Sequence, residues 1–240
     1  MCYNRFLSGA SMDVSSWDGT LSLNEFSLAA QAFEEKWKIS NSASPPWLWV
    51  NAPIRPFVAS QKVDGFLSME NICLLRPSED NGAEVSRLEE EKTSLSEKEE
   101  AIDDATLVHS NHHEVHYYDF HIVYSASYRV PVLYFRGYDS DGLPLQLNEI
   151  EKDLPACSAK VLLESKWTFI TQEEHPYFNR PWYKLHPCGT SEWMKLLFLD
   201  EAVLAESKVA IELHLVSWFS VVGQVIGLRV PIEMVNGRIN

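Results

Sequence analysis

Two neighbouring segments with alternating apolar residues constrain the fold of this chain more than any other feature. Residues Glu114–Tyr124 carry a large apolar or aromatic side chain at every second position from 118 onward, at Tyr118, Phe120, Ile122 and Tyr124. Residues Val130–Tyr138 follow after a short connection and are again mostly apolar. A period of two is typical of strands, and strands so close in sequence pair as an antiparallel hairpin. We therefore expect an antiparallel sheet, with a turn at Asp139–Gly142.

The remaining chain predicts helices around that sheet. Residues Ser22–Lys38 have helical spacing, and Ser22 with Glu25 three residues later forms a capping-box pattern. Further helices are expected at Leu147–Leu154 and Ser191–Leu204, and Ile211–Ile226 is apolar enough to be either a helix or a strand. Strands are expected at Trp47–Val50, Val58–Leu75 and Trp167–Gln172, and His175-Pro176 and Arg180-Pro181 predict an irregular, extended path. The fold class is α+β, an antiparallel sheet flanked by helices.

Residues 76–110 differ in kind from the rest. Residues 76–108 hold eleven Asp and Glu against four Lys and Arg, a net charge of −7, and no aromatic residue. Such a segment cannot bury enough apolar area to offset its ordering entropy, so we expect a disordered acidic insertion, with an acidic docking segment as the alternative. Residues 1–21 are expected to be a flexible extension, and translation starts at Met1 or at Met12.

Charge and cysteine content exclude several classes of protein. The net charge of −14 and a pI of about 5.0 argue against a nucleic-acid binder and a polybasic membrane module. The four cysteines include no C-x-x-C pair, which argues against a zinc ribbon and favours free thiols in a reducing, cytoplasmic setting. Four histidines lie between His109 and His116; metal ligation there is conceivable, but we favour a solvated loop and expect no metal.

Cys188, in the run Leu185-His186-Pro187-Cys188-Gly189-Thr190, has the most suggestive surroundings for chemistry. A helix is expected to begin just after it, with Thr190 or Ser191 as its cap, and the positive end of a helix favours a thiolate. A thiolate is the nucleophile that acyl transfer needs. If the stretch is extended, His186 points to the same side and serves as a proton acceptor or orients a carbonyl. Taken alone, a single cysteine is more often an inert buried thiol.

Four blocks of sequence resemble the autophagy-related protein ten family. They are Tyr124–Arg136, Trp167–Pro176, Leu185–Cys188 and the tail Ser217–Gly223 with Gly227–Pro231. The chain is identified as a plant-type or other divergent member of that family, which is similar to ubiquitin-conjugating enzymes in fold and reaction. The resemblance implies that residues 22–240 form one catalytic domain, interrupted by the acidic insertion.

The resemblance also implies partners and roles in autophagy and protein transport. Cys188 would accept the modifier autophagy-related protein twelve from its activating enzyme, autophagy-related protein seven. It would then pass the modifier to a lysine of autophagy-related protein five, without a cofactor. Ordinary ubiquitin-conjugating enzymes place a His-Pro-Asn element before the cysteine, and this chain lacks it at the usual position. The candidates for stabilising the oxyanion are His186, Asn179, Tyr128 and Tyr134.

Acceptor recognition is expected on the chain itself, and the hairpin Glu114–Tyr138 is the predicted acceptor surface, because an exposed sheet edge can pair with a partner strand. The alternative function is a non-catalytic interaction module with the same fold. A papain-like hydrolase ranks last, because only His214 follows Cys188 in the sequence.

Overall fold

The computed structural model describes residues 17–41, 45–52, 64–74, 115–160, 169–199 and 207–235. Its helices are α1 (Leu23–Ser40), α2 (Leu147–Asp153), α4 (Thr190–Leu199), α5 (Ser207–Val225) and α6 (Ile232–Val235). Its strands are β1 (Leu48–Asn51), β2 (Gly65–Leu74), β3 (His116–Ser125), β4 (Val130–Tyr138), β5 (Ile170–Glu174) and β6 (Pro181–Leu185). The predicted acidic insertion 76–110 lies outside the described residues, and the predicted extension 1–21 is described only from Trp17.

The six strands form one antiparallel sheet in the order β1-β2-β3-β4-β6-β5. The predicted hairpin is confirmed, with β3 and β4 paired from Tyr117 opposite Tyr138 to Ser125 opposite Val130. These two strands lie in the interior of the sheet, whose edges are β1 and β5. The prediction that the hairpin offers an exposed edge to the acceptor protein is contradicted along β3, which pairs with β2, and at Tyr134 and Phe135 of β4, which pair with β6.

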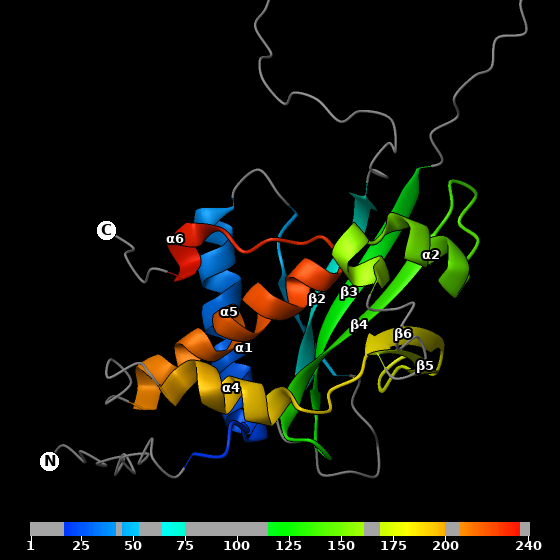
Figure 1. The fold of residues 1–240 in the computed structure, drawn as a ribbon. Coiled ribbons are helices and arrows are strands. Elements are labelled where there is room, and N and C mark those ends of the chain that lie inside the picture. The colour runs from blue at the N-terminus through cyan, green and yellow to red at the C-terminus, as the bar shows by residue number, and fades with distance from the viewer. Residues whose placement is uncertain are drawn as a thin grey trace, which may run out of the picture.

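The helices cover one face of the sheet. Figure 1 shows α1, α4, α5 and α6 together on that side. Helix α1 begins as predicted, since Ser22 and Glu25 form a complete capping box. Its buried Phe33 and Trp37 meet Phe219 of α5 with ring centroids 5.5 and 6.0 Å apart. Aromatic contacts of this kind bury large apolar areas, so they fix α1 and α5 against the sheet.

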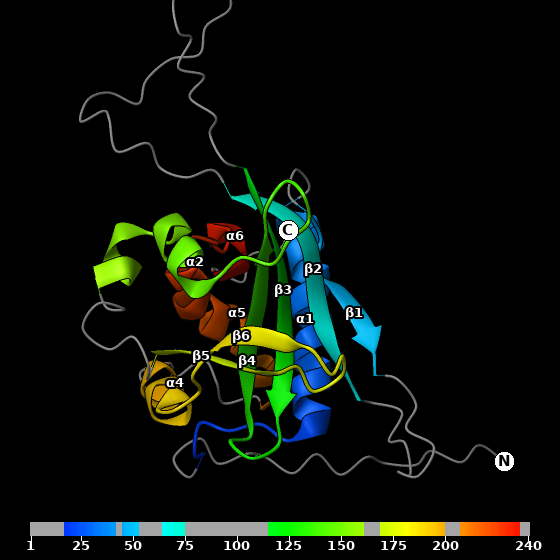
Figure 2. The same cartoon turned by 90° about the vertical axis from the view of Figure 1, so that its right-hand side faces the viewer.

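The β5–β6 hairpin packs on the other face. Strand β6 pairs with β4 only at Lys184 and Tyr183, and Figure 2 shows the hairpin crossing in front of β3 and β4. Beneath it lies a second apolar cluster of Phe66, Val123, Val132, Tyr134 and Trp182, joined by His121 and His175. The path predicted at Arg180-Pro181 is extended as expected, but from Pro181 onward it is a regular strand and not irregular. A proline is tolerated as the first residue of a strand, and Pro181 opens β6.

His116 is buried in β3 rather than in a solvated loop. Its Nδ1 lies 2.5 Å from Oδ2 of Asp153 in α2, and the hydroxyl of Tyr118 donates to the same oxygen at 2.5 Å. The carboxylate thus joins α2 to the sheet, and it explains why a histidine is stable at this depth.

Residues 211–225 are helical, as part of α5, which settles the choice between helix and strand in favour of a helix. Leu215, Trp218 and Phe219 of α5 are buried. Although α5 is the most apolar long helix, neither it nor any other helix among the described residues has the length and hydropathy to cross a membrane.

Candidate functional site

Cys188 lies in a short connection between β6 and α4. The connection starts as a continuation of the sheet, because the His186 amide donates to the carbonyl of Phe169 at 3.0 Å. Gly189 then takes a φ of +74°, and a Cβ added there would meet nothing within 4 Å. Glycine is therefore required for its left-handed backbone and not for close packing. The turn leaves the Cys188 side chain exposed at the beginning of a helix.

A hydrogen bond joins the backbone amide of Cys188 to the side chain of His186. The amide of Cys188 donates to Nδ1 of His186 at 3.2 Å. A neutral imidazole with an accepting Nδ1 carries its proton on Nε2. The half-buried ring therefore offers a donor at Nε2. This geometry favours orientation of a carbonyl or oxyanion over the alternative role of proton acceptor.

Tyr128 approaches the same place from the turn between β3 and β4. Its ring stands edge-on to His186, with centroids 6.1 Å apart and planes at 76°. Tyr128 remains 45% exposed in the described structure. The structure thus brings together Cys188, His186 and Tyr128 from two separate elements.

Asn179 and Tyr134 lie elsewhere. Asn179 occupies the turn between β5 and β6 with a φ of +50°, at the end of the hairpin opposite the Cys188 connection. Asparagine tolerates this left-handed conformation, which explains its presence there. Tyr134 pairs with Lys184 in mid-strand and is buried in the second cluster, where burial raises its pKa to about 12.

The start of α4 differs from the predicted cap. The carbonyl of Gly189 accepts from the amide of Trp193, so the helix begins at Thr190, and Gly189 precedes it. Thr190 and Ser191 are already helical, and Thr190 is buried. The other described cysteines, Cys73 and Cys157, are also exposed free thiols. Exposure alone therefore does not distinguish Cys188, whereas the hydrogen bond of its amide to the His186 ring does.

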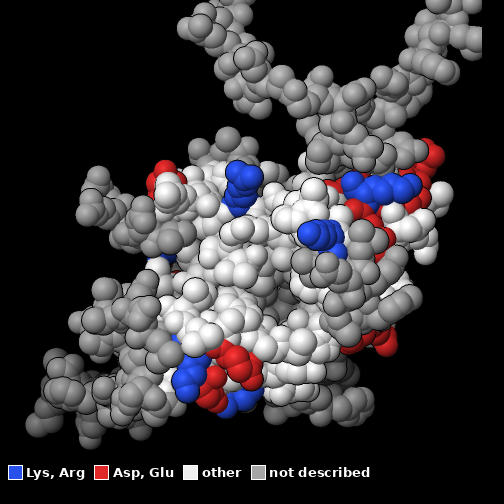
Figure 3. All heavy atoms as spheres, viewed as in Figure 1, with Lys and Arg blue, Asp and Glu red and all other residues white. Residues whose placement is uncertain are grey.

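Charged side chains are sparse in the view of Figure 3. Lys, Arg, Asp and Glu of the described residues lie there in a few small groups, separated by uncharged side chains. Half of the chain's net charge of −14 comes instead from residues 76–108 in the sequence. A partner contacting the described residues on this face would meet mostly uncharged side chains.

Comparison with known proteins identifies the family. Residues 25–233 match the model of the family described as autophagocytosis associated protein, active-site domain. The chain is 56% identical over 219 residues to the ubiquitin-like-conjugating enzyme ATG10 of Arabidopsis thaliana, covering 91% of this chain and 96% of that one. It is 40% identical over 120 residues to the human ubiquitin-like-conjugating enzyme ATG10, covering 50% and 53%.

A solved structure and a second group of relatives also match. A crystal structure of the autophagic E2 Atg10 aligns with a TM-score of 0.43 and 16% identity, over 87% of this chain and 98% of that one. Autophagy-related protein 3 of Pichia angusta is 34% identical over 92 residues, or 38% of this chain and 25% of that protein. The family model and the nearly full-length identity decide the assignment: the chain belongs to the autophagocytosis-associated active-site family, as one of its ATG10 ubiquitin-like-conjugating enzymes.

Proposed function

We propose that Cys188 carries the modifier autophagy-related protein twelve as a thioester and passes it to a lysine of autophagy-related protein five. Autophagy-related protein seven would supply the activated modifier. The observation that carries the proposal is an exposed Cys188 thiol just before α4, in a residue whose backbone amide bonds the His186 ring that Tyr128 contacts. The free thiols of Cys73, Cys157 and Cys188 fit a reducing, cytoplasmic setting.

The first step would be thioester exchange. The Cys188 sulfur attacks the carbonyl carbon of the modifier's C-terminal glycine, which is held as a thioester on the activating enzyme. The carbonyl electrons move onto oxygen, and they return as the bond to the activating enzyme's sulfur breaks. That sulfur leaves as a thiolate and takes up the proton that Cys188 released. The exchange is nearly neutral in bond energy, so binding of the two enzymes governs its direction.

The second step would be aminolysis. The lysine amine of the acceptor attacks the same carbonyl carbon, an oxyanion forms, and the bond to Cys188 breaks. The amine loses a proton, the sulfur leaves as a thiolate, and an isopeptide bond remains. A hydrogen-bond donor aimed at the oxyanion is typically worth about 3 kcal/mol in acyl transfer. The two candidates are His186 through Nε2–H and Tyr128, which contacts the His186 ring, through its hydroxyl.

A thioester assay tests the proposal. The chain is incubated with autophagy-related proteins seven and twelve and ATP, and adducts are separated with and without reducing agent. The wild type should give a thiol-sensitive adduct, Cys188→Ser a thiol-resistant oxyester, and Cys188→Ala none. Cys73→Ala and Cys157→Ala are the matched controls, since both remove another exposed thiol and should retain the adduct. An adduct that persists in Cys188→Ala would sink the proposal.

The identity of the partners is tested separately. Autophagy-related protein five is added to the preformed adduct, and the thiol-resistant product is mapped by mass spectrometry. The product should join the modifier's C-terminal glycine to one lysine of the acceptor. Replacement of that lysine by arginine should abolish the product and leave the adduct intact. If the adduct forms but never reaches this acceptor, the proposed acceptor is wrong and the nucleophile stands.

A further inference from the structure

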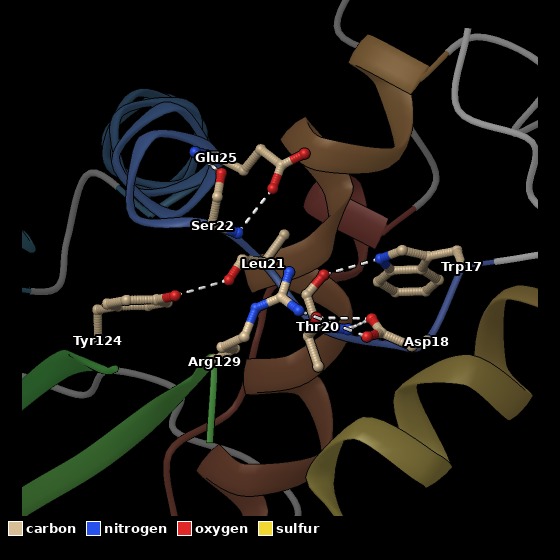
Figure 4. Close-up of polar contacts among 8 residues, drawn as sticks. All are labelled: Trp17, Asp18, Thr20, Leu21, Ser22, Glu25, Tyr124 and Arg129. Atoms are coloured by element: carbon tan, nitrogen blue, oxygen red, sulfur yellow. Dashed lines mark hydrogen bonds and ion pairs between the residues drawn. The ribbon is translucent and has the colours of Figure 1, made fainter. Parts of the chain in front are cut away.

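Residues Trp17–Leu21, here called the N-terminal strap, precede the family match, which starts at residue 25. They lie within the segment expected from the sequence to be a flexible extension, yet Gly19 and Leu21 are buried. Figure 4 shows the strap running from Trp17 to the start of α1, past Tyr124 and Arg129. A short segment is buried in this way only when its neighbours make specific contacts with it.

The strap is held in shape by its own hydrogen bonds. Oδ1 of Asp18 accepts from the Thr20 amide at 3.0 Å and from the Thr20 hydroxyl at 2.6 Å. The hydroxyl bond is the main cause that lowers the pKa of Asp18. Nε1 of Trp17 donates to the Thr20 carbonyl at 2.7 Å. These bonds close a turn around Gly19, whose φ of +81° lies in the left-handed region.

One side of the strap is bonded to the turn between β3 and β4. The Leu21 amide donates to the carbonyl of Arg129 at 2.8 Å, and the Tyr124 hydroxyl donates to the Leu21 carbonyl at 2.8 Å. Asp18 and Arg129 add an exposed ion pair at 3.6 Å. Arg129 itself has a φ of +55° and follows Tyr128 directly. The strap therefore fixes the backbone beside the tyrosine that contacts His186.

The other side of the strap is packed against α4 and α5. A Cβ added to Gly19 would lie 1.9 Å from the Ser191 carbonyl oxygen, so the two backbones touch. Ser191 is three residues beyond Cys188. The Trp17 ring meets Phe198 and His214 edge-on, with centroids 5.3 and 5.8 Å away. The strap thus contacts α4, the helix that follows Cys188, and α5.

We propose that the N-terminal strap is a positioning element for the reaction, with Gly19 and Asp18 as its positioning residues. It sets the distance between the turn that carries Tyr128 and the first turn of α4, and through them the surroundings of Cys188. The inference rests on the proposed role of Cys188. Misplacement of catalytic groups by about 1 Å can cost about a hundredfold in rate, so loosening the strap should lower activity without unfolding the protein.

A pair of glycine variants provides the first test. In Gly19→Ala the new methyl group collides with Ser191 and the φ is strained. In Gly142→Ala the φ of +79° gives the same strain, but nothing lies within 4 Å. Single-turnover thioester formation is measured at saturating charged activating enzyme, together with the free energy of unfolding. We expect Gly19→Ala to be slower by about tenfold or more and Gly142→Ala to stay within about twofold of wild type.

Two variants of Asp18 keep the inference testable if Gly19→Ala does not fold. Asp18→Asn retains the oxygen that accepts both Thr20 bonds, whereas Asp18→Ala removes it. Because Asp18 is exposed, both variants should fold. Asp18→Ala should lower the rate of thioester formation by about threefold or more, and Asp18→Asn should restore it.

A chemical readout separates positioning from general loosening. Alkylation by iodoacetamide is followed by mass spectrometry at Cys188, with Cys73 and Cys157 of the same molecules as references. Loss of positioning should change the rate at Cys188 relative to both references. If wild type forms no thioester, the proposed function fails. If wild type forms it and neither Gly19→Ala nor Asp18→Ala differs from its control in rate or in relative alkylation, the strap proposal alone is overturned.

Discussion

His121 and His175 meet ring to ring in the second apolar cluster, with 3.0 Å between Nδ1 of His121 and Nε2 of His175. Nδ1 of His175 accepts from the Tyr177 amide at 3.2 Å, so a neutral His175 carries its proton on Nε2 and donates it to His121. His121 must then carry its proton on Nε2, which lies 3.6 Å from Glu70. The arrangement is consistent only with two neutral rings.

The first prediction is a loss of stability in mild acid. Burial lowers the pKa of His121 and of His175 to about 3, from an unfolded value near 6.5. Between these values the unfolded chain binds more protons than the folded one, so the free energy of unfolding must fall as pH falls below about 6.5. Each histidine lowers the free energy of unfolding by up to about 1.4 kcal/mol for each pH unit of acidification in this range. Urea unfolding at pH 7, 6 and 5 measures the slope, and a flat profile would contradict neutral rings.

The second prediction concerns His214, a third buried histidine. Its pKa is also lowered to about 3 by burial, an effect that the nearby Gly19 backbone opposes, and neither ring nitrogen has hydrogen-bond geometry to another described group. Its ring lies against Trp17 and Phe198. His214→Phe should therefore change stability by less than about 1.5 kcal/mol at pH 7.5 and raise it relative to wild type at pH 5. Equal pH slopes for the two proteins would show that His214 does not contribute.

The third prediction separates two contributions of His186. The side-chain oxygen of asparagine reaches about the position of Nδ1, so His186→Asn can keep the acceptor for the Cys188 amide, and His186→Ala cannot. A hydrogen bond of this kind is worth about 0.5–1.5 kcal/mol, or about two- to tenfold in rate. His186→Ala should slow thioester formation by that factor, and His186→Asn should recover most of it. If both variants are equally slow, the contribution comes from Nε2 or from the ring contact with Tyr128.

The fourth prediction concerns the ion pair that joins β5 to β6. Nζ of Lys184 donates to Glu173 at 2.6 Å, and the lysine side chain is mostly buried while the glutamate is half exposed. Removal of the carboxylate leaves the ammonium without this partner. Glu173→Ala should cost about 1–2 kcal/mol of unfolding free energy and Glu173→Gln less, because the amide oxygen still accepts. Glu174→Ala, at an exposed position of the same strand, is the control and should be nearly neutral.

The elements that sequence reasoning predicted are those encoded locally. The β3–β4 hairpin follows from alternation within one short stretch, and the α1 start follows from the spacing of Ser22 and Glu25. Strand β6 was not predicted, because Pro181 suggests a break. Its pairing also depends on other strands, which no pattern within the segment reveals. A proline interrupts a strand only where the sheet needs a backbone N–H donor at that position. At the first position of a strand no such donor is needed.

The candidate site was predictable only in part for the same reason. Cys188 and His186 are near neighbours in sequence, so an extended path suffices to relate them. Tyr128 reaches His186 only because β4 and β6 are adjacent in the sheet, which no local pattern reveals. Asn179 lies away from Cys188 because the two residues are at opposite ends of the β5–β6 hairpin. The strap was not predicted because its contacts are with residues 124–214, which are far from it in the sequence.

The contacts of the N-terminal strap also fix an order of assembly during synthesis on the ribosome. Trp17 is made well before the residues it packs against, Phe198 and His214. At about 5–20 residues per second, the roughly 200 intervening residues take about 10–40 s to add. During that interval Trp17 has no native partner in α4 or α5. The strap is thus translated before its partners and docks after them, so the surroundings of Cys188 are completed only once α4 and α5 have been made.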